Sequence, residues 1–177
     1  MSAAEEFQEQ GIKLYSAQDF EGATRLFQQA LEAYQSEDRP DMVAEMQTNI
    51  GLTHRALGEY QQALDVMQKA LHTFQEMGDQ CRAAQVIGNI GGVYRALDDK
   101  EQAYNCYRQA ADIFLAIGQD KLYGETIIAL AKMQVRDGKI WMGAAMYEVG
   151  LEYIDNLSTS QKILKKVIAL RKRIIGG

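Results

Sequence analysis

The sequence predicts an all-α fold built from four helix hairpins, each about forty residues long. Three observations support this prediction. The chain is rich in Ala, Leu, Gln and Glu and has a single proline, Pro40, a composition that favours helices. The segment 49–64 (NIGLTHRALGEYQQAL) returns forty residues later as 89–104 (NIGGVYRALDDKEQAY), with eight of sixteen positions identical. Small and large apolar residues recur at the same interval along most of the chain.

Five columns of similar residues run through four repeats without an insertion. A fixed period of this kind indicates a repeat array, because one hairpin cannot bury its apolar face alone and stacked hairpins can. The small residues let the two helices of a hairpin approach closely, and the large residues fill the space beside them. The columns are Gly11, Gly51, Gly91 and Ala131; Ala23, Ala63, Ala103 and Gly143; Phe27, Met67, Tyr107 and Tyr147; Ala30, Ala70, Ala110 and Gly150; and Tyr34, Phe74, Phe114 and Ile154.

Turns separate the predicted helices in chain order. Before each turn, apolar or small residues recur at spacings of three and four, which is the helical period. We expect Gly58, Gly78 and Gly118 to end helices, and Asp79 and Asp120 to cap the helices that follow. Within the repeats the turns are 17–20, 57–60, 97–100 and 137–140, and between the repeats they are 36–41, 76–80 and 116–120.

The domain organisation follows from the period. Residues 4–154 form the array, with approximate repeat boundaries at 4–43, 44–83, 84–123 and 124–154. The period is lost in 155–177, where an apolar stripe and six Lys or Arg residues predict a basic amphipathic helix. We expect this helix to cap the apolar edge of the fourth repeat, as solenoids require. Contact with an anionic membrane or a partner, or a homodimer contact through Ile174 and Ile175, are the alternatives.

The repeat columns resemble the tetratricopeptide repeat, whose pattern is W-x2-L-G-x2-Y, then A-x3-F. The period of forty exceeds the usual thirty-four or so, and the closing proline is missing. The longer unit resembles the repeats of kinesin light chain, spindle-orientation scaffolds and bacterial peptide-sensing regulators. The resemblance implies a right-handed superhelical solenoid with a concave groove that binds peptides or proteins, and it implies no catalysis. Matching residues are Phe7, Gly11, Phe20, Ala23, Phe27 and Ala30; Ile50, Gly51, His54, Gly58, Tyr60, Ala63, Met67 and Ala70; Ile90, Gly91, Tyr94, Ala103, Tyr107 and Ala110; and Leu130, Gly138 and Tyr147.

In this family the first helix of each repeat lines the groove. The resemblance therefore implies a stripe at two residues before, one after and four after the small residue, a spacing that keeps the stripe on one helical face. An Asn amide has a donor and an acceptor and can bind a peptide backbone of any sequence, while the cations favour an acidic ligand. Alternatively, each Asn bonds to a neighbouring helix and each Arg bridges adjacent repeats. The predicted peptide-binding residues are Asn49, Leu52, Arg55, Asn89, Gly92, Arg95, Lys132 and Arg136.

The sequence lacks the signals that are typical of other functional classes. The net charge of −5 argues against nucleic-acid binding, and no apolar run is long enough to span a membrane. Cys81 and Cys106 have neither CxxC spacing nor a His pair, so we expect no metal site. The catalytic and cofactor-binding motifs HExxH, GxSxG, the P-loop and the dinucleotide fingerprint are missing, so we expect neither enzymatic activity nor a cofactor. We predict a cytoplasmic interaction module for a protein or peptide, with a self-assembling structural protein as the alternative.

Overall fold

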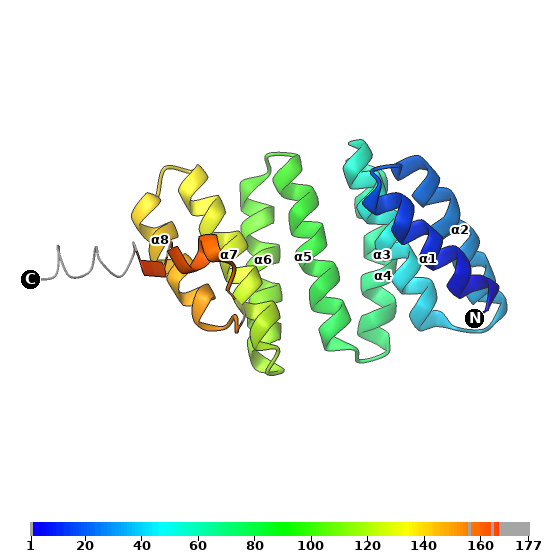
Figure 1. The fold of residues 1–177 in the computed structure, drawn as a ribbon. Helices are drawn as coiled ribbons and strands as arrows, with labels where there is room; N and C mark the ends of the chain where they lie inside the picture. The colour runs from blue at the N-terminus through cyan, green and yellow to red at the C-terminus, as the bar shows by residue number, and fades with distance from the viewer. Residues whose placement is uncertain (1, 156, 164, 167–177) are drawn as a thin grey trace, which may run out of the picture. The chain divides into compact units, whose positions relative to one another are not determined.

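The computed structural model describes residues 2–155, 157–163, 165 and 166, and these residues form helices joined by short turns (Figure 1). No strand occurs among them, so the predicted all-α class is confirmed. The helices are α1 (Ala3–Ser16), α2 (Phe20–Ser36), α3 (Pro40–Leu57), α4 (Tyr60–Glu76), α5 (Gln80–Ala96), α6 (Lys100–Ala116), α7 (Asp120–Arg136) and α8 (Ile140–Glu152).

The helix ends repeat every twenty residues, which is half the sequence period. Each of α1 to α7 is followed within two residues by a residue in the left-handed region, with φ between 53° and 81°. The next N–H bonds back to a carbonyl five residues earlier, as Glu59 does to His54 at 2.8 Å, so the last turn of the helix keeps its hydrogen bonds. Gly58, Gly78 and Gly118 end helices as predicted, and the other left-handed residues are Gln18, Asp38, Asp98 and Gly138.

The two predicted N-caps have different outcomes. The Asp79 side chain accepts a hydrogen bond from the backbone N–H of Arg82 at 2.9 Å and caps α5, as expected. The prediction for Asp120 is wrong, because Gln119 is the N-cap of α7 and makes no side-chain cap bond. Asp120 instead lies in the first turn, where a carboxylate still interacts favourably with the helix dipole.

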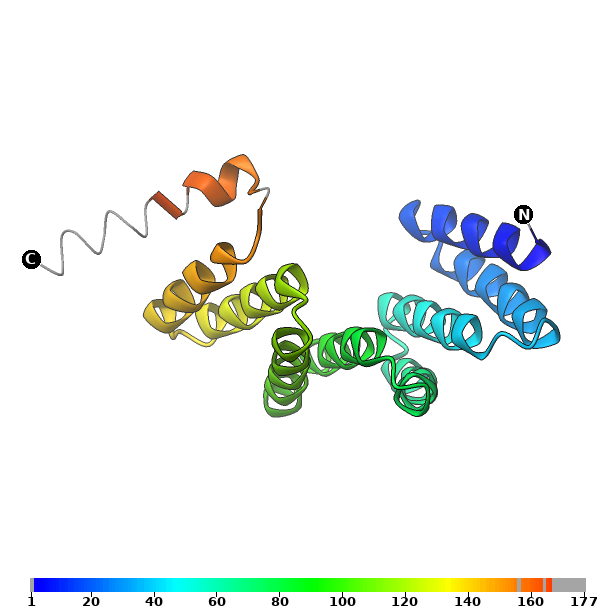
Figure 2. The ribbon, with the colours of Figure 1, turned by 90° about the horizontal axis from the view of Figure 1, so that it is seen from below.

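The chain divides into two compact units, Met1–Cys106 and Tyr107–Gly177, with the boundary inside α6. In the first unit each helix from α1 to α4 packs against its successor, and α3 also contacts α5 (Figure 2). Two apolar clusters form its core, one around Phe27, Tyr34 and Ile50 and the other around Met67 and Phe74. The predicted columns of large residues therefore lie in the core of this unit.

Small residues set the close contact of the helices inside the first unit. A Cβ atom at Gly11 would lie 2.7 Å from Cε1 of Phe27, and one at Gly51 would lie 2.5 Å from Cγ of Met67. Side chains at these two positions would overlap with the second helix of the same hairpin, since real Cβ contacts are longer. This geometry supports the role predicted for the small columns.

In the second unit α7 and α8 approach through glycines. A Cβ at Gly124 would lie 2.7 Å from the carbonyl oxygen of Gly150, and one at Gly143 would lie 2.7 Å from that of Ala131. The rings of Tyr123 and Tyr153 meet edge to face with centroids 4.7 Å apart beside this contact. The backbones themselves are thus in contact, which explains why glycine stands where the earlier repeats have alanine.

The division of the array into repeats with the boundaries given above stays a prediction. Most of the cap predicted over 155–177 lies outside the described residues, including Ile174 and Ile175. Within the described part, residues 159–163 are helical, and Ser158 exchanges hydrogen bonds with Gln161 at the start of this helix.

Candidate functional site

A pocket of about 310 Å³ lies between α3 and α5 in the first unit. Both are first helices of their hairpins, and they contact each other directly. The α3 side is lined by Glu45, Thr48, Asn49 and Leu52, the α5 side by Arg82, Gln85, Val86 and Asn89, and the floor also includes Phe74 of α4. The pocket thus combines an apolar floor with polar walls, as ligand-binding sites commonly do.

Asn49 and Asn89 are placed on opposite walls of this pocket. They occupy the same position in successive repeats, and both side chains are half-buried. Neither side-chain amide makes a hydrogen bond to another residue of the described chain. Because each amide can donate and accept, the pocket presents two sets of donors and acceptors that the described part of the chain leaves unused.

The apolar floor is formed by three side chains from three helices. Phe74 and Val86 are almost fully buried, with 2% and 1% of their surface exposed, and Leu52 is half-buried. Phe74 belongs to the core cluster of the unit, and Leu52 packs against that cluster. The pocket therefore opens directly onto the hydrophobic core, and an apolar ligand group would extend that core.

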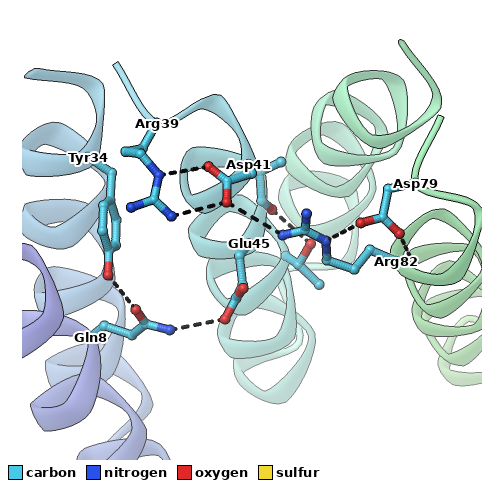
Figure 3. A network of polar contacts seen from close by, with 9 residues as sticks. Gln8, Tyr34, Arg39, Asp41, Glu45, Asp79 and Arg82 are labelled. Atoms are coloured by element: carbon cyan, nitrogen blue, oxygen red, sulfur yellow. Dashed lines mark hydrogen bonds and ion pairs between the residues drawn. The ribbon is translucent and has the colours of Figure 1, made fainter. Parts of the chain in front are cut away.

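A chain of hydrogen bonds reaches the pocket from α1 and α2 (Figure 3). The Tyr34 hydroxyl donates to Oε1 of Gln8 at 2.7 Å, and Nε2 of Gln8 donates to Oε1 of Glu45 at 3.0 Å. Burial, with the charges of nearby carboxylates including Glu45, raises the pKa of Tyr34, so its hydroxyl keeps its proton. These contacts fix the orientation of the Glu45 carboxylate at one end of the pocket.

Arg82 is held by contacts on several sides (Figure 3). Its Nε donates to Oδ2 of Asp79 at 2.6 Å, its Nη1 lies 4.0 Å from Oδ2 of Asp41, and its guanidinium carbon lies 4.7 Å from the centre of the Phe74 ring. Arg39 in turn donates two hydrogen bonds to Asp41, at 3.1 and 3.2 Å. The two arginines and two aspartates therefore balance one another in charge.

The two aspartates show the effect of these contacts on their pKa values. Hydrogen bonds from Arg39 hold the pKa of Asp41 below its ordinary value. Burial alone would raise the pKa of Asp79, but hydrogen bonds from the backbone and guanidinium of Arg82 outweigh it, so that pKa is also lowered. Both carboxylates are thus ionised at neutral pH.

The structure brings only part of the predicted stripe together. Asn49, Leu52 and Asn89 line the pocket. Arg55 is half-buried and follows Thr48 by seven residues, about two helical turns, so it projects from the pocket side of α3. Arg95 is exposed and does not line the pocket.

The remaining predicted residues do not line this pocket. Gly92 is buried inside the helix packing. Lys132 and Arg136 are exposed on α7 in the second unit. There Lys132 lines a separate hollow of about 480 Å³, together with Lys121, Glu125, Ile128, Ile154, Asp155 and Gln161.

Sequence reasoning missed four polar residues of the pocket. Glu45, Gln85 and Arg82 lie one or two turns before Asn49 or Asn89, and Thr48 lies one turn before Leu52. Extending the predicted stripe in that direction would have found them, because residues three, four and seven apart share a helix face. These residues are Glu45, Thr48, Arg82 and Gln85.

In the part of the chain that the structure describes, no cluster of three or more His, Cys, Asp or Glu side chains could hold a metal ion. None of the described helices has the length and apolar character needed to cross a bilayer.

Comparison with protein families gives two matches. The family described as "Soluble NSF attachment protein, SNAP" matches residues 53–167, which is more than half of the chain. The family described as "Tetratricopeptide repeat" matches residues 9–76. The predicted resemblance to tetratricopeptide repeats is therefore confirmed. Among curated protein sequences, none matches this chain.

Solved structures with similar folds include two helical repeat proteins. The crystal structure of BtubC (BKLC) from P. vanneervenii is 18% identical, with a TM-score of 0.72 over 88% of this chain and 67% of its own. The apo form of RapI is also 18% identical, with a TM-score of 0.74 over 98% of this chain and 71% of its own. At this identity the comparison establishes the fold, which is that of the tetratricopeptide-like helical repeats.

Proposed function

Because the chain belongs to the soluble NSF attachment protein family and carries tetratricopeptide-like repeats, we propose that it is a non-enzymatic, cytoplasmic interaction module. Its ligand is an extended segment of a protein or peptide, bound in the groove between α3 and α5. One observation carries this proposal: Asn49 and Asn89 lie on opposite walls of a pocket with their amides unbonded to other described residues.

The geometry of an extended chain fits two facing amides. In a strand, the N–H and C=O of one residue point to the same edge, and those of the next residue point to the other edge. Asn49 would pair with the N–H and C=O of one ligand residue, and Asn89 with those of its neighbour. This pairing is independent of the ligand's side chains, so it supplies affinity, while the pocket floor and the surrounding charges supply specificity.

The other predicted residues take different places in this proposal. Leu52 contributes to the apolar floor, and Arg55 supplies a cation for an acidic residue of the ligand. Arg95 remains a proposed contact for a ligand longer than the pocket, and Gly92 remains a proposed point of close backbone approach. Lys132 and Arg136 remain proposed ligand contacts of the second unit. Cofactors and metals have no part in the proposed activity.

The test is a selection of random nine-residue peptides displayed on phage against the immobilised full chain. We expect Asn49→Ala combined with Asn89→Ala to weaken binding of the selected peptides more than tenfold, because two pairs of charge-neutral hydrogen bonds are lost. The melting temperature should stay nearly unchanged, since neither amide bonds to a described residue. Asn105→Ala is the matched control, because Asn105 is exposed on the second helix of its hairpin. Unchanged affinity in the double variant would refute the assignment of the groove.

Self-assembly is the second candidate function, and one surface favours it. Helix α8 exposes 54% of Met142 and 42% of Val149, and these residues lie seven apart, about two helical turns. They therefore form an apolar stripe on one side of α8, and association of two copies through this stripe is the alternative to a ligand-binding module.

A further inference from the structure

The pocket between α3 and α5 carries one uncompensated charge at its N-terminal end. Arg82 is neutralised by Asp79, as described above, whereas Glu45 forms no ion pair with a cation of the described chain. Its carboxylate accepts one hydrogen bond from the neutral Gln8, through Oε1, and Oε2 keeps its acceptor capacity. A ligand cation placed here would complete the hydrogen bonding of a half-buried carboxylate.

The positive charge of Arg55 lies farther along α3. Arg55 is half-buried on the pocket side of α3 and forms no ion pair with a described carboxylate. It comes ten residues after Glu45, so the two charges are about 15 Å apart along the helix axis. The apolar floor at Leu52, Phe74 and Val86 lies beside the stretch of α3 between them.

An extended peptide matches these three features at a definite spacing. Each residue of a strand advances about 3.3 Å, and alternate side chains point to the same face. Side chains at positions one, three and five of a peptide therefore face the groove and span about 13 Å. That length fits the separation of the two charges, and the central side chain meets the apolar floor.

We infer that the groove between α3 and α5 selects an extended segment with a basic residue at Glu45, an apolar residue two positions on at the pocket floor, and an acidic residue two positions farther at Arg55. The inference rests on the proposed function and specifies its ligand class. The ligand is of mixed charge, rather than uniformly acidic. Either chain direction satisfies the motif, because an extended chain presents alternate side chains in the same way in both directions.

The experiment compares the amino-acid pattern of phage-displayed nine-residue peptides selected by different variants of the full chain. We expect the wild-type protein to enrich Lys or Arg and Asp or Glu four positions apart, with an apolar residue midway. Glu45→Lys should replace the basic preference by an acidic one, giving acidic residues at both ends. Arg55→Glu should give basic residues at both ends. Arg25→Glu makes the same charge change on the exposed face of α2, outside the pocket, and it should leave the pattern unchanged.

Affinity measurements on single peptides complete the test. The neutral variants Glu45→Gln and Arg55→Gln should each weaken a selected mixed-charge peptide about tenfold, since each removes a hydrogen bond between charged groups. The new side chain of Glu45→Gln can still accept the hydrogen bond from Gln8, so this variant keeps that internal contact. It therefore still tests the charge of residue 45 if Glu45→Lys disturbs folding. Circular dichroism melting curves check that each variant is folded.

The outcomes separate this inference from the proposed function. If the wild-type protein enriches no peptide, both are overturned. If enriched peptides depend on Asn49 and Asn89 but show no pairing of opposite charges four apart, only the charge motif is overturned. A pattern that survives Glu45→Lys or changes equally with Arg25→Glu would also refute it.

Discussion

Gln18 and Gly58 occupy the same backbone position at the ends of successive first helices. Their φ angles are 65° and 81°, both in the left-handed region. A side chain in this region crowds the following carbonyl, which costs about 1–2 kcal/mol for most residues, whereas glycine has no such penalty. Gln18 is exposed, and its side chain makes no hydrogen bond within the described chain to offset the strain.

We therefore predict that Gln18→Gly raises the free energy of unfolding by about 0.5–1 kcal/mol, and that Gly58→Gln lowers it by a similar or larger amount. Chemical denaturation followed by circular dichroism measures both. Ala17→Gly is the control, because Ala17 has an ordinary φ of −81° and glycine there only adds flexibility to the unfolded chain. Stabilisation by Ala17→Gly, or none by Gln18→Gly, would contradict the argument from strain.

At the scale of the helix, Asp79 combines two roles at the start of α5. One carboxylate oxygen caps the helix through the backbone N–H of Arg82, and the other pairs with the guanidinium of the same residue. Asp79→Ala should lower the free energy of unfolding by about 1–2 kcal/mol, because both contacts are lost. Asp79→Asn should cost less, because Asn also caps helices well and only the ion pair is removed.

The stability difference between wild type and Asp79→Asn should depend on pH. The folded pKa of Asp79 is lowered, so the ionised form stabilises the fold fully above the ordinary carboxyl pKa of about 3.9. That contribution is lost as pH falls below this value toward the folded pKa. Denaturation curves between neutral pH and pH 3 measure the difference, and a gap that stayed constant or widened in acid would contradict this role for the pair.

The helices were predictable from sequence because their determinants are local. Gly58, Gly78 and Gly118 end helices at the predicted turns, since glycine adopts positive φ without strain. Asp120 was wrongly predicted as a cap, because the local sequence pattern does not locate the start of a helix to within one residue. The only sign of the glycine contact between α7 and α8 in the sequence was that Gly143 and Gly150 replace the alanines of the earlier repeats.

The pocket was harder to predict, because it depends on which residues of two neighbouring repeats face each other. Asn49 and Asn89 were found through their repetition, which a single sequence reveals. Arg82 has no counterpart of the same type in the other repeats, where Met42 and Leu122 stand. Its position against Asp41 and Phe74 is a tertiary contact, and no periodic signal encodes it.

For the whole molecule, the two candidate functions predict different masses in solution. Helix α8 has thirteen residues, so it is about 20 Å long and 10 Å wide, and its exposed stripe covers roughly 200 Å². A stable interface needs about 800 Å² from each partner, and the net charge of −5 on each chain also opposes association.

We therefore expect light scattering after size-exclusion chromatography to give the mass of one chain, 19.9 kDa, at every concentration tested. This result would favour the ligand-binding module. A mass that doubled with concentration, and returned to one chain in Val149→Glu, would establish self-association through α8. Val149→Glu is suited to this purpose because Val149 is exposed and its replacement places a charge in the stripe without disturbing the core. Glu45→Gln is the matched control, because Glu45 lies in the first unit and outside α8, and it should leave the mass of the particle unchanged.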